Sequence, residues 1–426
     1  MTFHEPAAGH SAFCSIVPPY LLQQIAVLDG RADFGDAGGP SPRAPQGPSV
    51  LPPDQRERVA EAARRTMELD EGMRRRREVF TERGRRDHRD GRGLLPGPRS
   101  TPGAIDSPAL TTGSTHTRSQ TTTGATETPS PHRSIHDAKH GTTLPGTLVR
   151  AEGASASKDV SVNQAYDGLG DTWQLYWQAY QRNSLDGKGL PLVATVHYER
   201  NYDNAFWDGD QMVFGDGDGT YFNGFTSSVD VIGHELTHGV TQFTAGLTYV
   251  GQSGALNESI SDCFGSMVKQ HSLGESAAEA DWLIGEGLFT SKVKGVALRS
   301  MKAPGTAYDD PVLGKDPQPA DMDGYADLPH DADHDNGGVH TNSGIPNRAF
   351  YLAATGIGGT SWEGAGAVWY DVLTSSGIPK DLDFAGFAQR TVDAAAARFG
   401  ASSAAVTAVR EAWETVKVLT PQSFLR

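Results

Sequence analysis

The chain has 426 residues, a length that suggests two or three structural units. Its formal net charge of -15 argues against nucleic acid as a partner, because phosphate binding needs a basic face. Its two cysteines, Cys14 and Cys263, exclude a disulfide framework, and no apolar run approaches the roughly 18 residues of a membrane span.

The N-terminal region begins without a basic stretch or an unbroken apolar run, so we expect no conventional signal peptide. Residues 54–90 are highly charged and predict a helix with a thin apolar stripe. The arginine run at 74–77 can be interpreted as a nucleic-acid or membrane patch. Interleaved acidic residues favour a solvated helix face instead.

A Gly/Pro/Ser/Thr-rich tract at 91–131 predicts an exposed, cleavable linker. Residues 133–230 carry β-branched runs and turn residues typical of a sheet, with one helix near 162–182. The chain after residue 230 predicts a helical region, with a long Asp/Pro/Gly loop at 308–338. Its apolar periodicity places helices at 231–245, 257–271, 346–355, 362–375, 383–400 and 403–419.

The most informative motif is His-Glu-Leu-Thr-His at 234–238. His234 and His238 are four residues apart, so on a helix both imidazoles can reach one metal ion. Glu235 can then take the proton of a water molecule activated there. The bare motif also occurs by chance in unrelated proteins, so a third ligand is needed.

Glu258 supplies that third ligand on a second predicted helix, twenty residues after His238. Three protein ligands with one open position are typical of catalytic zinc. Asp262 lies one turn beyond Glu258 and, with Asn257, is expected to hold the other ring nitrogens of the two histidines.

These residues identify a resemblance to the thermolysin-like zinc metallopeptidases over residues 134–419. Further matching motifs are Asn-Ala-Phe-Trp at 204–207, Gly-Asp-Gly-Asp-Gly at 215–219, Leu-Arg-Ser-Met at 298–301 and the segment from 335 to 344. The resemblance implies an α+β fold, with a β-rich N-terminal lobe, a helical C-terminal lobe and zinc in the cleft between them. It also implies the lobe boundaries 133–240 and 241–426.

The resemblance assigns transition-state roles to three further residues. It implies that His340 donates a hydrogen bond to the oxyanion, that Asp335 orients His340, and that Tyr249 is a second donor. From residue type alone, a solvated histidine is the favoured interpretation of His340 and a packing residue that of Tyr249.

Substrate contacts are implied in the same way. Asn204 and Ala205 resemble edge-strand residues that pair with an extended substrate backbone. Arg299 resembles the arginine that binds the carbonyl of the residue following the scissile bond. The neighbouring pocket, which predicts a hydrophobic residue after the cut, is lined by Phe222, Phe225, Val231 and Leu298. Core packing is the alternative interpretation of these four.

A calcium site of the family is expected to be reduced here. Three of its acidic positions are retained, namely Asp230, Asp281 and Glu286. Lys269 and Leu283 replace acidic ligands, and the ammonium of Lys269 can substitute for one calcium charge. Val296 replaces another usual aspartate. The acidic loop at 321–335 lacks the distal glutamate of an EF-hand and is interpreted as a solvated loop.

The Pro-Pro-Tyr sequence at 18–20 resembles the protealysin-type subgroup, whose short precursor lacks a recognisable export signal. It implies an autoinhibitory propeptide at 1–90, removed by cleavage in or near a linker at 91–132. Cys14 can supply a thiolate to zinc in the latent form, although the motif does not require a cysteine. Cys263 is interpreted as a small buried apolar residue.

The sequence thus predicts a zinc endopeptidase acting on peptides or proteins, with its own propeptide as inhibitor. Secretion is implied by the family, and a cytoplasmic zymogen is the alternative. A zinc-containing binding module without catalysis is a rival from another class, disfavoured by the presence of Glu235, Tyr249 and His340.

Overall fold

The computed structural model describes residues 14–31, 51–89 and 129–421, with the side chains of 74–89 left aside. The side chains of the arginine run at 74–77 and most of the 91–131 tract therefore lie outside what the structure describes. Within them, no helix is both long and apolar enough to cross a bilayer.

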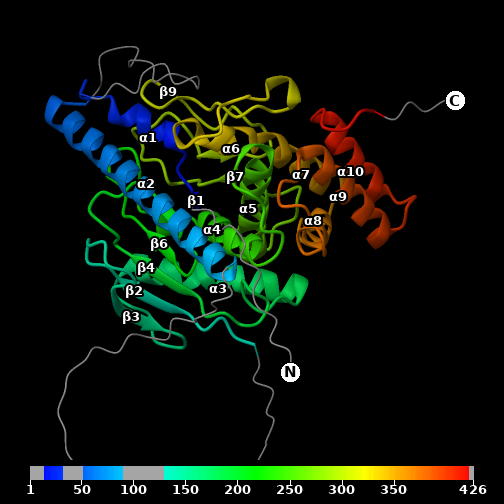
Figure 1. Cartoon of the computed structure of the whole chain (residues 1–426), viewed down its shortest axis with the longest axis horizontal. Coiled ribbons are helices and arrows are strands. Elements are labelled where there is room, and N and C mark those ends of the chain that lie inside the picture. Colours follow the sequence, from blue (N-terminus) through cyan, green and yellow to red (C-terminus); the bar gives the residue numbers. More distant parts are fainter. Residues whose placement is uncertain (1–13, 32–50, 90–128, 422–426) are drawn as a thin grey trace, which may run out of the picture.

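A six-stranded mixed sheet forms one end of the molecule (Figure 1). Its middle pairs, β2 with β4 and β4 with β6, are parallel, and its other neighbours are antiparallel. In spatial order the strands are β1 (Cys14–Ser15), β5 (Ala205–Trp207), β6 (Met212–Phe214), β4 (Val193–Val196), β2 (Ser134–Asp137) and β3 (Thr147–Ala151).

The N-terminal lobe contains less strand than the sequence predicts. Helix α3 (Val160–Tyr180) alone has 21 residues, whereas each strand there has three to five. The helix begins within two residues of its predicted start, where Asp159 caps the N–H groups of Ser161 and Val162. The β-branched residues are thus divided among short strands that pack against this helix.

Two central helices, α4 (Val229–Gln242) and α5 (Gly251–Leu273), pack side by side between the lobes (Figure 1). Their close approach needs glycine: a Cβ on Gly265 would lie 2.4 Å from the backbone oxygen of Asp230. Every residue of α4 from Asp230 to Thr241 is buried. The two helices therefore form a rigid support for the polar side chains between them.

The C-terminal lobe contains the predicted helices α7 (Gly344–Ile357), α8 (Ala365–Leu373), α9 (Phe384–Phe399) and α10 (Ala404–Thr415). Aromatic packing joins them, with the rings of Trp369 and Trp413 stacked 5.8 Å apart. The sequence missed α6 (Asp335–Asn342), because its first turn contains residues in left-handed conformations at 336–338. The sheet in the N-terminal part and the helices in the C-terminal part together confirm the predicted α+β fold.

The N-terminal segment adds two helices, α1 (Pro19–Ala26) and α2 (Pro53–Arg89), which pack against each other. Figure 1 shows α2 running diagonally from beside α1 toward α3, across the half of the molecule that holds the sheet. The prediction of α2 was correct to one residue. Helix α1 was not predicted, although it starts directly in the Pro-Pro-Tyr motif and buries Leu21, Leu22 and Ile25.

Candidate metal centre and substrate cleft

The two histidines of α4 converge on one point. The Nε2 atoms of His234 and His238 lie 3.0 Å apart, and both side chains are buried. Two nitrogens that face each other this closely cannot both carry a proton without repulsion. The arrangement fits lone pairs directed at a shared cation.

The outer ring nitrogens of both histidines have acceptors on α5. Nδ1 of His234 donates to Asp262 at 2.7 Å, and Nδ1 of His238 donates to Asn257 at 2.9 Å. These bonds leave each Nε2 free to act as a ligand. Burial lowers the pKa of His238 to about 3, so its imidazole is neutral, the form that binds a metal.

Glu258 completes the set of donors. Its Oε2 lies 3.5 Å from Nε2 of His234, and its Oε1 lies 3.6 Å from Nε2 of His238. Burial opposes its ionisation, but His340, His238 and His234 lower its pKa to about 2. Oε2 is buried and accepts no hydrogen bond from any residue that the structure describes. Two imidazoles and one unsatisfied carboxylate fit zinc.

Glu235 lies beside this cluster. Its Oε2 accepts a hydrogen bond of 3.0 Å from the backbone N–H of Trp207. Its Oε1 is buried and has no hydrogen-bond partner among the described residues. Burial, together with the charge of Glu258, raises its pKa. One oxygen of Glu235 is thus fixed by the sheet and the other is available to a proton donor.

His340 and Tyr249 lie beside Glu258 of the same cluster. Nδ1 of His340 donates to Asp335 at 2.6 Å, and the Tyr249 hydroxyl lies 3.4 Å from Nε2 of His340 and also bonds to Glu258. Burial opposes the charged imidazole, while Asp335 and Glu258 raise the pKa of His340. His340, Asp335 and Tyr249, which are expected to act together, therefore lie next to one another.

Arg299 in β8 (Arg299–Ser300) has two functions in this geometry. Its Nε and Nη2 donate to Asp262 at 2.8 Å each, and its Nη1 donates to the carbonyl of Ile16 at 3.1 Å. The predicted contact of Arg299 with a substrate carbonyl stays a prediction, and the sequence analysis did not predict the ion pair with Asp262. Asn347, which the sequence analysis did not select, also donates to Asp262, at 2.8 Å.

The N-terminal strand β1 binds where a substrate backbone is expected. It pairs antiparallel with β5, with Cys14 opposite Trp207 and Ser15 opposite Phe206. The N–H of Ile16 donates to the carbonyl of Ala205 at 3.1 Å. The N–H of Val17 donates to Oδ1 of Asn204 at 2.9 Å. Asn204 and Ala205 thus contact the backbone of a segment of the chain itself, and their pairing with a substrate stays a prediction.

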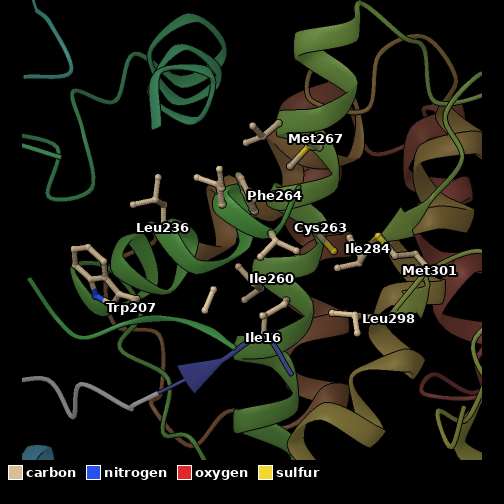
Figure 2. Packing of buried hydrophobic residues seen from close by; sticks show 14 of the residues in the cluster. Ile16, Trp207, Leu236, Ile260, Cys263, Phe264, Met267, Ile284, Leu298 and Met301 are labelled. Atoms are coloured by element: carbon tan, nitrogen blue, oxygen red, sulfur yellow. The ribbon is translucent and has the colours of Figure 1, made fainter. Parts of the chain in front are cut away.

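The predicted pocket residues are all buried, with at most 2% of their surface exposed. They belong to one apolar cluster that also contains Ile16, namely Phe222, Phe225, Val231 and Leu298. Figure 2 shows the side chain of Ile16, which directly follows β1, on the same side as Ile260 and Leu298 of this cluster. These four residues are therefore part of the hydrophobic core, and their role as a pocket wall stays a prediction.

The side-chain ammonium of Lys269 links two of the three residues expected to bind calcium. Nζ of Lys269 lies 2.6 Å from Asp281 and 2.9 Å from Glu286. Asp230 is buried and accepts from the N–H groups of Val231 and Gly285. The described residues contain one group of three or more convergent metal ligands, and it is the histidine cluster. The lysine thus supplies positive charge between the carboxylates.

That histidine cluster has a fourth member, Cys14. Its Sγ, the two Nε2 atoms and the Glu258 carboxylate all lie within 4.8 Å of one another, and the thiol is buried. Sγ is 2.8 Å from Oε1 of Glu258 and 3.0 Å from the Tyr249 hydroxyl. The only sequence feature that pointed to this contact was the position of Cys14, four residues before Pro18.

Comparison with known proteins agrees with this geometry. Residues 107–242 match the thermolysin metallopeptidase catalytic domain, and residues 245–418 match the thermolysin metallopeptidase alpha-helical domain. An extracellular metalloprotease of Pectobacterium carotovorum is 56% identical over 69% of this chain and 83% of its own length. A thermolysin of Bacillus caldolyticus is 39% identical over 66% of this chain and 50% of its own length.

Among solved structures, the precursor of protealysin, a metalloproteinase from Serratia proteamaculans, is similar. Its TM-score is 0.71 and its identity 44%, over 95% of this chain and all of that one.

Proposed function

Since the chain belongs to the thermolysin family of zinc metallopeptidases, we propose that it is an endopeptidase made as an autoinhibited zymogen. The observation that carries the proposal is the convergence of His234, His238 and Glu258 beside Glu235, with a peptide of the same chain across the site. The carbonyl oxygen of Ser15 lies 3.1 Å from Nε2 of His340, the proposed oxyanion donor.

His234, His238 and Glu258 would hold the metal, and Asp262 and Asn257 would fix the two imidazoles. Zinc bound there supplies a Lewis acid that makes a water molecule acidic. Glu235 accepts a proton through its unpartnered Oε1 and passes it to the leaving amine. His340, oriented by Asp335, and Tyr249 donate to the oxygen on which negative charge develops.

Substrate binding would use the contacts that the N-terminal segment makes. Asn204 and Ala205 align the backbone, which gives affinity without reading side chains. Arg299 fixes the carbonyl after the scissile bond. The buried apolar cluster around Leu298 supports a preference for a hydrophobic residue at that position.

Latency is supported by the path of residues 14–17, which fill the edge of β5 and cover the catalytic residues. We divide the chain into a propeptide at 1–90, a linker at 91–132 and catalytic lobes at 133–240 and 241–426. Removal of the propeptide would free the substrate edge of the sheet.

Secretion of the protein is inferred from its similarity to a relative named as extracellular, with a cytoplasmic zymogen as the alternative. Mass spectrometry of culture medium and cell lysate would distinguish them. A mature form with a new N-terminus between residues 85 and 133, found in the medium, is the expected result. An active sample that contains only full-length chain contradicts maturation.

Hydrolysis of casein after removal of the propeptide tests the activity. We expect hydrolysis that a zinc chelator abolishes and that added zinc restores. Glu235→Ala should bind zinc normally but lose activity by several orders of magnitude, because the proton acceptor is missing. The exposed Glu279→Ala is a matched control that should retain wild-type activity. An inert wild-type protein with zinc bound would instead indicate a binding module.

A further inference from the structure

Two independent contacts select the same peptide bond of the N-terminal segment. Arg299, the expected partner of the carbonyl after the scissile bond, donates to the carbonyl of Ile16. His340, the expected oxyanion donor, lies 3.1 Å from the carbonyl oxygen of Ser15. Both assignments place the bond between Ser15 and Ile16 at the reacting position.

The flanking residues follow the same register. Ile16 is fully buried and belongs to the same hydrophobic core as the residues expected to line the pocket for the residue after the cut. Val17 is held through both its N–H and its carbonyl by Asn204, at 2.9 and 3.5 Å. The segment therefore binds in the direction and register of a substrate, so the catalytic residues face a bond that they could hydrolyse.

What separates this segment from a substrate is Cys14, the second residue before the bond. The thiol of Cys14 turns into the histidine cluster and contacts Glu258 and Tyr249. A catalytic zinc site needs an open fourth position for water, and a cysteine thiolate is a good zinc ligand. The unpartnered, buried Oε2 of Glu258 independently supports a cation at this cluster. Sγ thus takes the place that water needs.

We propose that the bond between Ser15 and Ile16 is a latent self-cleavage site, protected by the Cys14 thiol as the fourth donor to the metal. This inference rests on the proposed peptidase function. When the thiol is removed, water adds to the carbonyl carbon of Ser15 and the bond from that carbon to the Ile16 nitrogen breaks. Ile16 leaves as an amine that gains a proton from the water, and Ser15 keeps the second oxygen as a carboxylate.

Cys14→Ala in the zinc-loaded full chain tests this directly. We expect loss of the full-length mass and gain of peptide 1–15 together with fragments that begin at Ile16. Wild type should not release peptide 1–15 over the same time course. Cys263→Ala should behave like wild type, since Cys263 is a buried cysteine outside the ligand cluster. The double variant Cys14→Ala, Glu235→Gln should remain uncut at this bond.

Cobalt in place of zinc gives a readout that does not depend on cleavage. Wild type and Cys263→Ala should show a thiolate-to-cobalt charge-transfer absorption, and Cys14→Ala should lack it. An unchanged absorption in Cys14→Ala would overturn the fourth-donor role.

Cys14→Ser serves if the alanine variant fails to fold, because a hydroxyl fills similar space and is a poorer zinc ligand. Folded variants that hydrolyse casein without ever producing an Ile16 terminus would overturn the self-cleavage site while leaving the peptidase function intact. Zinc-loaded variants that hydrolyse neither casein nor this bond would refute the proposed function, and this inference with it.

Discussion

At the scale of single residues, the candidate site depends on a chain of hydrogen bonds that extends outward from the metal ligands. His234 is held by Asp262, and Asp262 is held by Arg299 and Asn347. Asp262 and Arg299 are both fully or nearly fully buried. One carboxylate thus orients a metal ligand and neutralises a cation that contacts the bound peptide.

Asp262→Asn should therefore weaken zinc binding by about 10- to 100-fold, the usual cost of losing such an outer partner. It also leaves the Arg299 charge buried without its ion pair, which typically costs about 3–5 kcal/mol of stability. Competition with a chromophoric chelator measures the first effect and urea unfolding the second. The exposed Asp333→Asn is the matched control. Wild-type zinc affinity in Asp262→Asn would refute the orienting role.

At the scale of elements, His197 connects the start of α3 to a loop of the N-terminal lobe. Its Nε2 donates to Asp159, the N-cap of α3, at 2.9 Å, and its Nδ1 donates to Asp216 at 2.8 Å. His140 faces the same Asp216 at 3.5 Å. Asp216 and Asp159 raise the pKa of His197 to about 9 against the opposing effect of burial.

Because this folded-state pKa lies above the ordinary 6.5, protonated His197 stabilises the fold fully below about pH 6.5. The contribution is lost as the pH rises through about 9. His197→Asn, which tolerates the positive φ of 54° at this position, should be less stable than wild type at pH 7. The difference should shrink by pH 10, as measured by urea unfolding at both values.

His140→Asn is the control for this experiment, because its side chain is twice as exposed, at 39% against 19%. It should cause a smaller loss at pH 7. A deficit of His197→Asn that stays constant from pH 7 to pH 10 would contradict the charged interaction.

At the scale of the whole molecule, the N-terminal segment is bound through α2 as well as through β1. Asp70 of α2 is buried, accepts from Nδ2 of Asn204 at 2.9 Å and also bonds to the Tyr202 hydroxyl. Thr66 accepts from the N–H of Asp203 at 3.1 Å. The same Asn204 therefore contacts both α2 and Val17, so the two attachments share one residue.

Asp70→Ala should weaken the hold of α2 on the catalytic lobes and speed the onset of casein hydrolysis. The substitution removes the charged acceptor of two buried donors, Asn204 and Tyr202. Leaving such donors without a partner typically costs about 1–3 kcal/mol of stability. Glu68→Ala, on the exposed side of the same helix, is the control and should activate like wild type. Equal activation rates in both variants would argue against Asp70 as an anchor.

Local patterns predicted much of this protein. The α-helix period by itself brings His234 and His238 to one side of α4, and the apolar spacing located α2, α3 and the helices α7 to α10. These features depend on residues a few positions apart, so the sequence contains them directly. Helix α6 was missed because its first turn departs from right-handed helical geometry.

The tertiary structure alone decided which distant residues meet. Cys14 reaches Glu258 across 244 positions, and Arg299 reaches Ile16 across 283. Lys269 was predicted to replace a calcium charge, and folding brings it between Asp281 and Glu286. No local spacing encodes such contacts, because they arise when the N-terminal segment and the two lobes pack on α4 and α5. The sequence by itself thus determined the metal-binding helix, whereas packing determined what lies across it.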